Sequence, residues 1–413
     1  MKKRLVLFLA LAFTFASVQP ACAQLEYLSQ HPEYLAATDY LCSTGPVDLT
    51  AAPDGYEPFY ISHYGRHGAR YAWQSDMYER LNKVFTKAEE EGNLTAKGKE
   101  FKRKFDILYP DVRYRVGDLS RKGWQQQKEL AERMYSNFPE VLGGDAYVMA
   151  RTSTSTRCVM TMSSFCLGLK GCNPRMEIFE NFGKYFLPAI LPQDGSNPFR
   201  DKNYEKTPLK FSETWEQYIE RTIKYKPILK RLFKNIDKAV DPKEQWDFVS
   251  YLYFFGAGMM SLDTDLDFND IFTAKERIAL YKIDAFQFYA SAWPGRLGYM
   301  PIVKDIIEKA DERIASGQRG AELRFGHDYT FLPLVMILNV NGMGREALSG
   351  DEIPGICPLE NVPMGANLHF VFYRSAEDPA ILFKVLLNGQ EATLPLQTGN
   401  WPYYDWDAFK AQF

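Results

Sequence analysis

The residue types best suited to chemistry lie between Arg66 and Arg70, where R-H-G-A-R follows the short apolar run 59–61. Two guanidinium groups that flank an imidazole can hold a phosphoryl group through paired N–H donors, while a ring nitrogen of His67 faces the phosphorus atom. Gly68 carries no side chain, so the backbone can pass close to a ligand there. The apolar run predicts a strand, and the polar residues after it predict an anion-binding loop at the strand end.

A second anion-binding signal is the hydroxyl-rich sequence R-T-S-T-S-T-R at 151–157. The apolar stretch 146–150 leads into it, and apolar residues at helical spacing follow it. The free N–H groups of a helix N-terminus attract anions, so Arg157 at the start of this helix can contact the same ligand. An arginine in this position could equally cap the helix or form an ion pair, and its role therefore depends on the other stretches.

The third stretch, 323–330, places the pair His327-Asp328 between an apolar strand pattern and an apolar helix pattern. A histidine alone in such a position is usually structural. A His-Asp pair at a strand end, however, can project into the same pocket as the first loop. Together the three strand ends predict one anion site, although they are separated by long stretches of sequence.

The other histidines and the basic run have less chemical interpretations. His63 lies four residues before His67 and could line the site or point away from it on an extended segment. His31 and His369 are expected to be structural. The lysine-rich run 97–104 is interrupted by an acid, and we interpret it as a solvated helix face instead of an anion site.

No metal or cofactor site is expected. The acidic run 263–267 resembles the start of a calcium loop, but Phe268 stands where the sharp turn needs glycine, and Ala274 stands where a bidentate glutamate is required. The sequence contains no C-x-x-C motif, which argues against a zinc or redox site.

The chain begins with the pattern of a secretory signal peptide: a basic start at 2–4, an apolar core at 5–18 and an A-x-A cleavage site at 21–23. Cleavage after Ala23 predicts a periplasmic or secreted protein, and a lipoprotein anchored through Cys22 is the alternative. No later stretch is apolar enough for a membrane span. Removing three of the 49 Lys and Arg residues leaves 46 against 52 acidic residues, so no nucleic-acid partner is expected.

Cysteine pairing is left open by the sequence. The number of cysteines after the leader is odd, so at least one thiol is unpaired or bonded elsewhere. Cys158 and Cys166 lie on one expected helix, too far apart along it for a bridge. The cysteines concerned are Cys42, Cys158, Cys166, Cys172 and Cys357.

The patterns around the motifs predict a chain in three parts: a leader at 1–23, an α/β catalytic domain at 24–180 and 300–413, and a helical cap insert at 181–299. Apolar runs at 367–373 and 381–387, joined by an Asn-Gly turn, predict strands at the edge of a sheet. Amphipathic patterns predict helices at 76–91, after a cap at 117–120, and at 213–235, 244–256 and 274–293.

Taken together, the three stretches resemble the histidine acid phosphatase family, the larger branch of the histidine phosphatases. Their flanking residues are similar to the multiple inositol polyphosphate phosphatases, in R-C-V at 157–159 and in F-G-H-x-x-T-x-L-P-L at 325–334. Members of that subgroup usually carry His-Ala-Glu where this chain has His327-Asp328-Tyr329. The acid therefore lies one residue nearer the histidine, as in ordinary acid phosphatases and many phytases.

The resemblance implies a fold and a set of site residues. The fold is α/β, a phosphoglycerate-mutase-like α/β sandwich with a mixed central sheet and an inserted helical cap. In the implied mechanism His67 attacks phosphorus and forms a phosphohistidine, Asp328 protonates the leaving alkoxide, and neither a metal nor a cofactor takes part. The implied substrate-binding residues are Arg66, Arg70, Arg157 and His327.

The expected function is that of a secreted phosphomonoesterase acting on inositol polyphosphates, phytate or similar small phosphorylated metabolites. One alternative is a broad-specificity acid phosphatase without a preference for phytate. Another is a periplasmic binder of phosphate esters that has no turnover. A product profile from inositol hexakisphosphate separates the first two functions, and trapping of a phosphohistidine excludes the third.

Overall fold

A mixed sheet forms the centre of the computed structural model, which describes residues 21–413. The strand order is β3-β2-β4-β1-β5-β6-β7, and β8 pairs with β6. The expected signal peptide lies almost entirely outside the described residues. The strands are β1 (Tyr56–Arg66), β2 (Tyr147–Thr152), β3 (Glu177–Phe182), β4 (Gly320–Gly326), β5 (Asn367–Ser375), β6 (Leu382–Leu387), β7 (Gln390–Ala392) and β8 (Tyr404–Asp405).

Strand β1 lies in the middle of this sheet, parallel to β4 on one side and antiparallel to β5 on the other. It continues to Arg66, well past the apolar run 59–61, because residues 62–65 pair with both neighbours. Strand β5 is also interior, between β1 and β6, so the prediction of a sheet edge there was wrong. The predicted α/β fold class with a mixed central sheet is confirmed.

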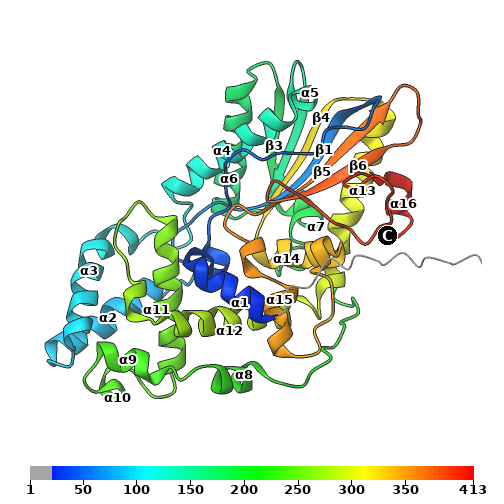
Figure 1. Ribbon diagram of the computed structural model, residues 1–413. Helices are drawn as coiled ribbons and strands as arrows, with labels where there is room; N and C mark the ends of the chain where they lie inside the picture. The colour runs from blue at the N-terminus through cyan, green and yellow to red at the C-terminus, as the bar shows by residue number, and fades with distance from the viewer. Residues whose placement is uncertain (1–20) are drawn as a thin grey trace, which may run out of the picture.

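Helices cover both faces of the sheet (Figure 1). On one face α4 (Arg121–Asn137), α5 (Pro139–Leu142) and α6 (Thr156–Cys172) enclose an apolar cluster that includes Ile61 and Phe165. The opposite face is covered by α7 (Leu187–Ile190) and α13 (Met300–Ser316). The predicted start of α4 is confirmed, since the Ser120 side chain accepts a hydrogen bond from the Gly123 N–H.

A helical body lies beside the sheet and is built from two stretches of chain (Figure 1). Helices α2 (Met77–Glu90) and α3 (Ala96–Val112) come from the segment that sequence assigned to the catalytic domain, yet they pack against the later helices α9 and α11. The Phe101 ring of α3 and the Phe255 ring of the later helix α11 have centroids 6.1 Å apart at this contact. We propose that the cap comprises both 77–112 and 215–292. Its later helices are α8 (Trp215–Thr222), α9 (Lys226–Leu232), α10 (Ile236–Ala239), α11 (Gln245–Gly258) and α12 (Ala274–Ala292).

Two elements connect the sheet to the helical body. Helix α14 (Asp328–Ile337) begins two residues after β4 and packs against both β1 and α12. The 3-10 helix η1 (Pro32–Asp39) packs against α11 and α12. The other helices are α1 (Ala21–Gln30), α15 (Ile353–Ile356) and α16 (Trp406–Lys410).

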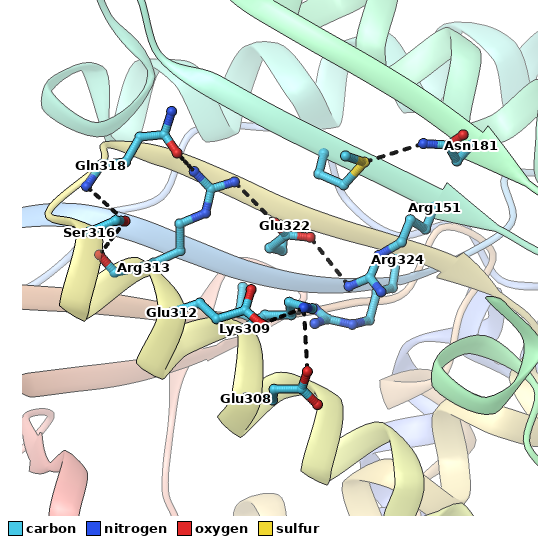
Figure 2. Close-up of polar contacts among 12 residues, drawn as sticks. Arg151, Asn181, Glu308, Lys309, Glu312, Arg313, Ser316, Gln318, Glu322 and Arg324 are labelled. Carbon is cyan, nitrogen blue, oxygen red and sulfur yellow. Dashed lines mark hydrogen bonds and ion pairs between the residues drawn. The ribbon is translucent and has the colours of Figure 1, made fainter.

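A buried network of ion pairs fixes α13 against β2 and β4. Figure 2 shows Arg151 of β2 and Arg313 of α13 both reaching Glu322 of β4, at 3.3 and 3.0 Å. Asp305 of α13 pairs with Arg151 at 3.0 Å and accepts from Nε of Arg324 at 2.7 Å. Each buried charge thus has a partner, as burial of ions requires. The network holds the two strands whose ends carry the second and third sequence motifs.

The cysteines after the leader form no bridges: Cys42, Cys158, Cys166, Cys172 and Cys357 are free thiols. Within residues 21–413 no helix combines the length and the apolar character needed to cross a membrane.

Candidate active site

The ends of three parallel strands open into a cavity of about 480 Å³ between the sheet and the helical body. Strand β1 ends at Arg66, β2 at Thr152 and β4 at Gly326. Because β4 runs parallel to both other strands, the residues that follow the three strands meet at the same sheet edge. From the sequence-predicted set, this cavity is lined by His67, Arg70, Arg157 and Asp328.

His67 is buried, and its Nδ1 lies 3.0 Å from the carbonyl oxygen of Gly68. A proton on Nδ1 donates to that oxygen, and Nε2 is then unprotonated. Burial lowers the pKa of His67 well below its ordinary value, and the positive charges of Arg66 and Arg70 lower it further. The imidazole is therefore neutral and has a free lone pair, which is the form that a nucleophile requires.

Arg66 is fully buried and is held at three points. Its Nη1 donates to the backbone carbonyl oxygens of Thr38 at 2.6 Å and Val362 at 2.8 Å. Its Nη2 donates to Oδ2 of Asp328 at 2.6 Å. These contacts fix the plane of the guanidinium group, so it is oriented before any ligand arrives.

Arg70 lies 3.6 Å from the buried acid Asp39, measured from its Nη2 to Oδ1 of Asp39. Burial raises the pKa of Asp39, although the charges of Arg70 and Arg66 oppose this rise. Within residues 21–413 the buried Nε atoms of Arg66, Arg70 and Arg157 have no hydrogen-bond partner. Because Arg70 and Arg157 line the cavity, their guanidinium groups can meet an oxyanion there.

Arg157 reaches across to the third motif, where its Nη2 donates to Nδ1 of His327 at 3.0 Å. Because a guanidinium group is only a donor, Nδ1 must accept and the ring proton lies on Nε2. Burial and the charge of Arg157 lower the pKa of His327 to about 3. The ring centroid lies 5.4 Å from that of His67 and 4.9 Å from that of Tyr329, which stacks on it. His327 is thus a neutral N–H donor beside the histidine of the first motif.

Asp328 is the first residue of α14, and its Oδ1 accepts from the Tyr329 N–H at 2.8 Å. Burial raises the pKa of this carboxyl, but the positive charges of Arg66 and Arg70 outweigh burial and hold the pKa below its ordinary value. Without a ligand the side chain is therefore a carboxylate that neutralises the arginine cluster.

All six residues that the sequence marked come together here, whereas His63 does not. Its side chain faces α6, with ring centroids 5.3 Å from Phe165 and 4.9 Å from His369. In the basic run, Lys97 and Lys104 both pair with Asp270 on the helical body, and Lys102 is buried and pairs with Asp106. These lysines have protein partners, so the interpretation of the run as a solvated helix face was wrong for them.

Gly68 lies against the start of α4. A Cβ atom there would lie 2.7 Å from the carbonyl oxygen of Gly123 at the start of α4. The missing side chain lets the first loop pack against this helix, and so it supports the loop behind His67.

Several lining residues carry no sequence signal. Thr38 and Asp39 belong to η1, in a segment that the sequence pattern left irregular. Asp284 of α12 also lines the cavity and is 4% exposed. An acid on an otherwise apolar helix face was the one available hint for Asp284, and a single residue of this kind is too common to interpret.

The fold and the site define a class of protein. It is an α/β protein that places a neutral histidine among arginines and an acid at the carboxyl edge of a sheet. Residues 65–388 match the model of the histidine phosphatase superfamily (branch 2). The match spans more than half of the chain, which therefore belongs to this superfamily, and the resemblance stated from the motifs is confirmed.

Individual relatives are distant. The chain is 22% identical over 328 residues to human multiple inositol polyphosphate phosphatase 1, and the match covers 68% of this chain but 62% of that protein. Among solved structures, the Bifidobacterium longum multiple inositol polyphosphate phosphatase in complex with inositol hexasulfate is similar with a TM-score of 0.68 at 16% identity, over 90% of this chain and 96% of that one. The phytase from D. castellii has a TM-score of 0.65 at 16% identity, over 92% and 84%. At these identities the structural matches show the shared fold.

Proposed function

We propose that this protein hydrolyses phosphate monoesters through a covalent phosphohistidine on His67. The observation that carries this proposal is a neutral, buried His67 in one cavity with Arg70, Arg157 and Asp328, while Arg66 holds Asp328 from behind the lining. Membership of the histidine phosphatase superfamily supports it independently.

In the first step Nε2 of His67 attacks phosphorus in line with the ester oxygen. The P–N bond forms as the P–O ester bond breaks, and Asp328 gives its proton to the departing alkoxide. The negative charge on the other phosphoryl oxygens is met by the guanidinium groups of Arg66, Arg70 and Arg157. The Nε2–H group of His327 adds a neutral donor.

In the second step a water molecule attacks the phosphohistidine. Asp328, now a carboxylate, takes a proton from this water, the P–N bond breaks, and inorganic phosphate leaves with His67 again neutral. The Nδ1–H···O=C contact to Gly68 persists through both steps, so the same ring nitrogen always faces phosphorus.

The protonation of Asp328 depends on the substrate. In the free protein Arg66 holds it as a carboxylate, at 2.6 Å. A bound phosphate dianion competes for that guanidinium group and adds negative charge beside the carboxyl, and both effects raise the pKa of Asp328. Substrate binding therefore generates the protonated acid that the first step uses.

Small phosphate esters are the proposed substrates. The relatives named above bring inositol polyphosphates and phytate into this set. A broad-specificity phosphatase is the alternative, and the products formed from inositol hexakisphosphate distinguish the two.

We also propose that the protein is exported after removal of its leader. Sequencing the N-terminus of protein recovered from the periplasm or the medium tests this directly. A mature chain that begins at Gln24 is the expected result, and an intact Met1 on functional protein in the cytoplasm contradicts it.

The phosphohistidine is tested by rapid acid-free quenching after mixing with a ³²P-labelled ester, followed by peptide mapping. Label is expected on the peptide that contains His67 and is expected to be absent from a His67→Ala variant. His31→Ala is the matched control, because His31 is half exposed and pairs with Glu33 away from the cavity. Label that survives in His67→Ala overturns the proposed mechanism.

A further inference from the structure

The cavity has two chemically different walls. The sheet side holds the phosphate-binding cluster described above. The opposite wall comes from α11 and α12 of the helical body, which lie below the sheet edge in Figure 1. On α12 the lining residues follow helical spacing, with Asp284 deepest and Gln287, Phe288 and Ser291 after it. A leaving group that extends from a phosphate held by the arginines can reach this wall, because both line the same cavity.

Asp284 is the unusual residue of this wall. It is 4% exposed, and neither oxygen of its carboxyl group has a hydrogen-bond partner among the described residues. A buried polar group without a partner destabilises a protein, and most such groups are therefore paired. Here Asp284 lines a cavity, so a ligand in that cavity can supply the partner that the protein does not.

The charge of the cavity lining limits what this ligand is. Among the described lining residues the cationic side chains are Arg70 and Arg157, and both belong to the phosphate-binding cluster. The opposite wall carries the acids Asp247 and Asp284, together with amide, hydroxyl and aromatic groups. A second phosphate on the leaving group would meet carboxyls and aromatic rings there, without a guanidinium or ammonium group to pair with.

We propose that Asp284 is a specificity-determining residue that hydrogen-bonds a hydroxyl group of the leaving group, and that its wall favours esters with one phosphate on a hydroxylated alcohol over polyphosphates. This inference rests on the proposed phosphatase activity and narrows its substrate class. It departs from the polyphosphate substrates that the relatives' names suggest.

The electrostatic surroundings of Asp284 fit this role. Burial raises its pKa well above the ordinary value, and the acids Asp39 and Asp328 raise it further, while Arg66 opposes them. The carboxyl is therefore neutral at acidic pH, so it can donate its O–H to a hydroxyl oxygen without repelling the phosphate dianion nearby.

Three esters of ring alcohols test the proposal. Cyclohexyl phosphate has one phosphate and no hydroxyl group. Inositol 1-phosphate has one phosphate, and each of its remaining ring carbons carries a hydroxyl group. Inositol hexakisphosphate has a phosphate on every ring carbon. For the wild-type protein we expect kcat/KM for inositol 1-phosphate to exceed each of the other two by at least about tenfold, the order expected of one well-formed hydrogen bond or one uncompensated charge.

Asp284→Ala should lower kcat/KM for inositol 1-phosphate by about tenfold and leave that for cyclohexyl phosphate within about twofold. Asp284→Asn keeps a donor and an acceptor at this position. This variant should therefore retain most of the wild-type preference, in kcat/KM, for inositol 1-phosphate over cyclohexyl phosphate. Asp54→Ala is the matched control, since Asp54 is exposed in the turn before β1, at the opposite end of that strand from the site.

Each outcome decides between the proposals. Faster hydrolysis of inositol hexakisphosphate than of inositol 1-phosphate overturns the specificity inference and leaves the phosphatase mechanism intact. Equal losses on all esters in Asp284→Ala, accompanied by a lower melting temperature, assign Asp284 a structural role and likewise overturn the inference. Absence of both phosphate release and a phosphohistidine refutes the proposed function itself.

Discussion

Replacing Asp328 by asparagine separates its ion pair with Arg66 from the proton transfer that the proposed mechanism assigns to it. Asparagine has nearly the same shape but cannot donate a proton to an alkoxide. General acid catalysis by one side chain contributes about 10²–10⁴-fold, so the first-turnover rate on an alkyl ester should fall by about that factor. A nitrophenolate leaves without a proton, and its ester should transfer phosphate to His67 in Asp328→Asn within a few-fold of the wild-type rate.

The same substitution should tighten the binding of aryl phosphate. In the free protein Asp328 occupies Nη2 of Arg66 through a charge-assisted contact of 2.6 Å. Such contacts contribute about 1.5–3 kcal/mol, against about 1 kcal/mol for the neutral bond that asparagine would make. Phosphate therefore displaces asparagine more easily by about 1 kcal/mol, which corresponds to about a fivefold lower dissociation constant.

Stopped-flow mixing with p-nitrophenyl phosphate measures the first turnover as a burst of nitrophenolate. Asp328→Asn should give a full burst followed by a slow steady state, because the second step has lost its base. Quenched-flow assays with cyclohexyl phosphate should show no burst. Equal reductions of the first-turnover rate on both esters, or loss of the burst on the aryl ester, would show that Asp328 is not the proton donor.

Three further predictions concern the histidines and Arg66. His67→Ala should lower phosphate release by at least about 10³-fold while keeping the wild-type circular dichroism spectrum, and full activity would contradict its role as nucleophile. Arg66→Ala should lower kcat/KM by about 10²–10³-fold, as removal of one preorganised donor does, and a change in KM alone would argue against stabilisation of the transition state. Burial and the charge of Arg133 lower the pKa of His369 to about 3 in the folded protein, so its contribution to stability is complete above pH 6.5 and is lost as the pH falls toward 3. The free energy of unfolding in urea should therefore fall between pH 7 and pH 5 by about 2 kcal/mol less in His369→Phe than in the wild-type protein. Equal decreases in the two proteins would refute this.

The convergence of the candidate site residues could be predicted from sequence because their signals are local. Each motif combines an apolar strand with the polar start of the next segment, and R-H-G-A-R, Arg157 and His327-Asp328 all lie at such junctions. Parallel pairing of β1, β2 and β4 then places the three junctions at one edge. The sequence pattern thus implied the convergence without any knowledge of distances.

Other features depend on contacts between segments far apart in the sequence. The partners of Arg66 include the carbonyl oxygens of Thr38 and Val362, and backbone carbonyls leave no trace in the residue pattern. Side chains alternate between the two faces of a strand, and His63 lies on the face of β1 that packs against α6, opposite the ion-pair network. Which face each residue of β1 occupies depends on its register with the neighbouring strands, and sequence alone does not give this register. The packing of α2 and α3 with the later helices is likewise tertiary.

The acids of the site explain how so many buried cations are tolerated before substrate arrives. Asp39 and Asp328 neutralise Arg70 and Arg66 in the free protein, at 3.6 and 2.6 Å. A bound phosphate dianion neutralises these arginines in place of the carboxylates. Asp328 then loses its ion pair with Arg66, and its pKa rises when the reaction needs a proton. Asp284 has no such cation to give up, since no ion pair joins it to a described residue and both of its oxygens lack partners. The proposed complement of Asp284 is therefore a neutral hydroxyl of the leaving group, so in this proposal the two kinds of acid in the cavity meet two different parts of one substrate.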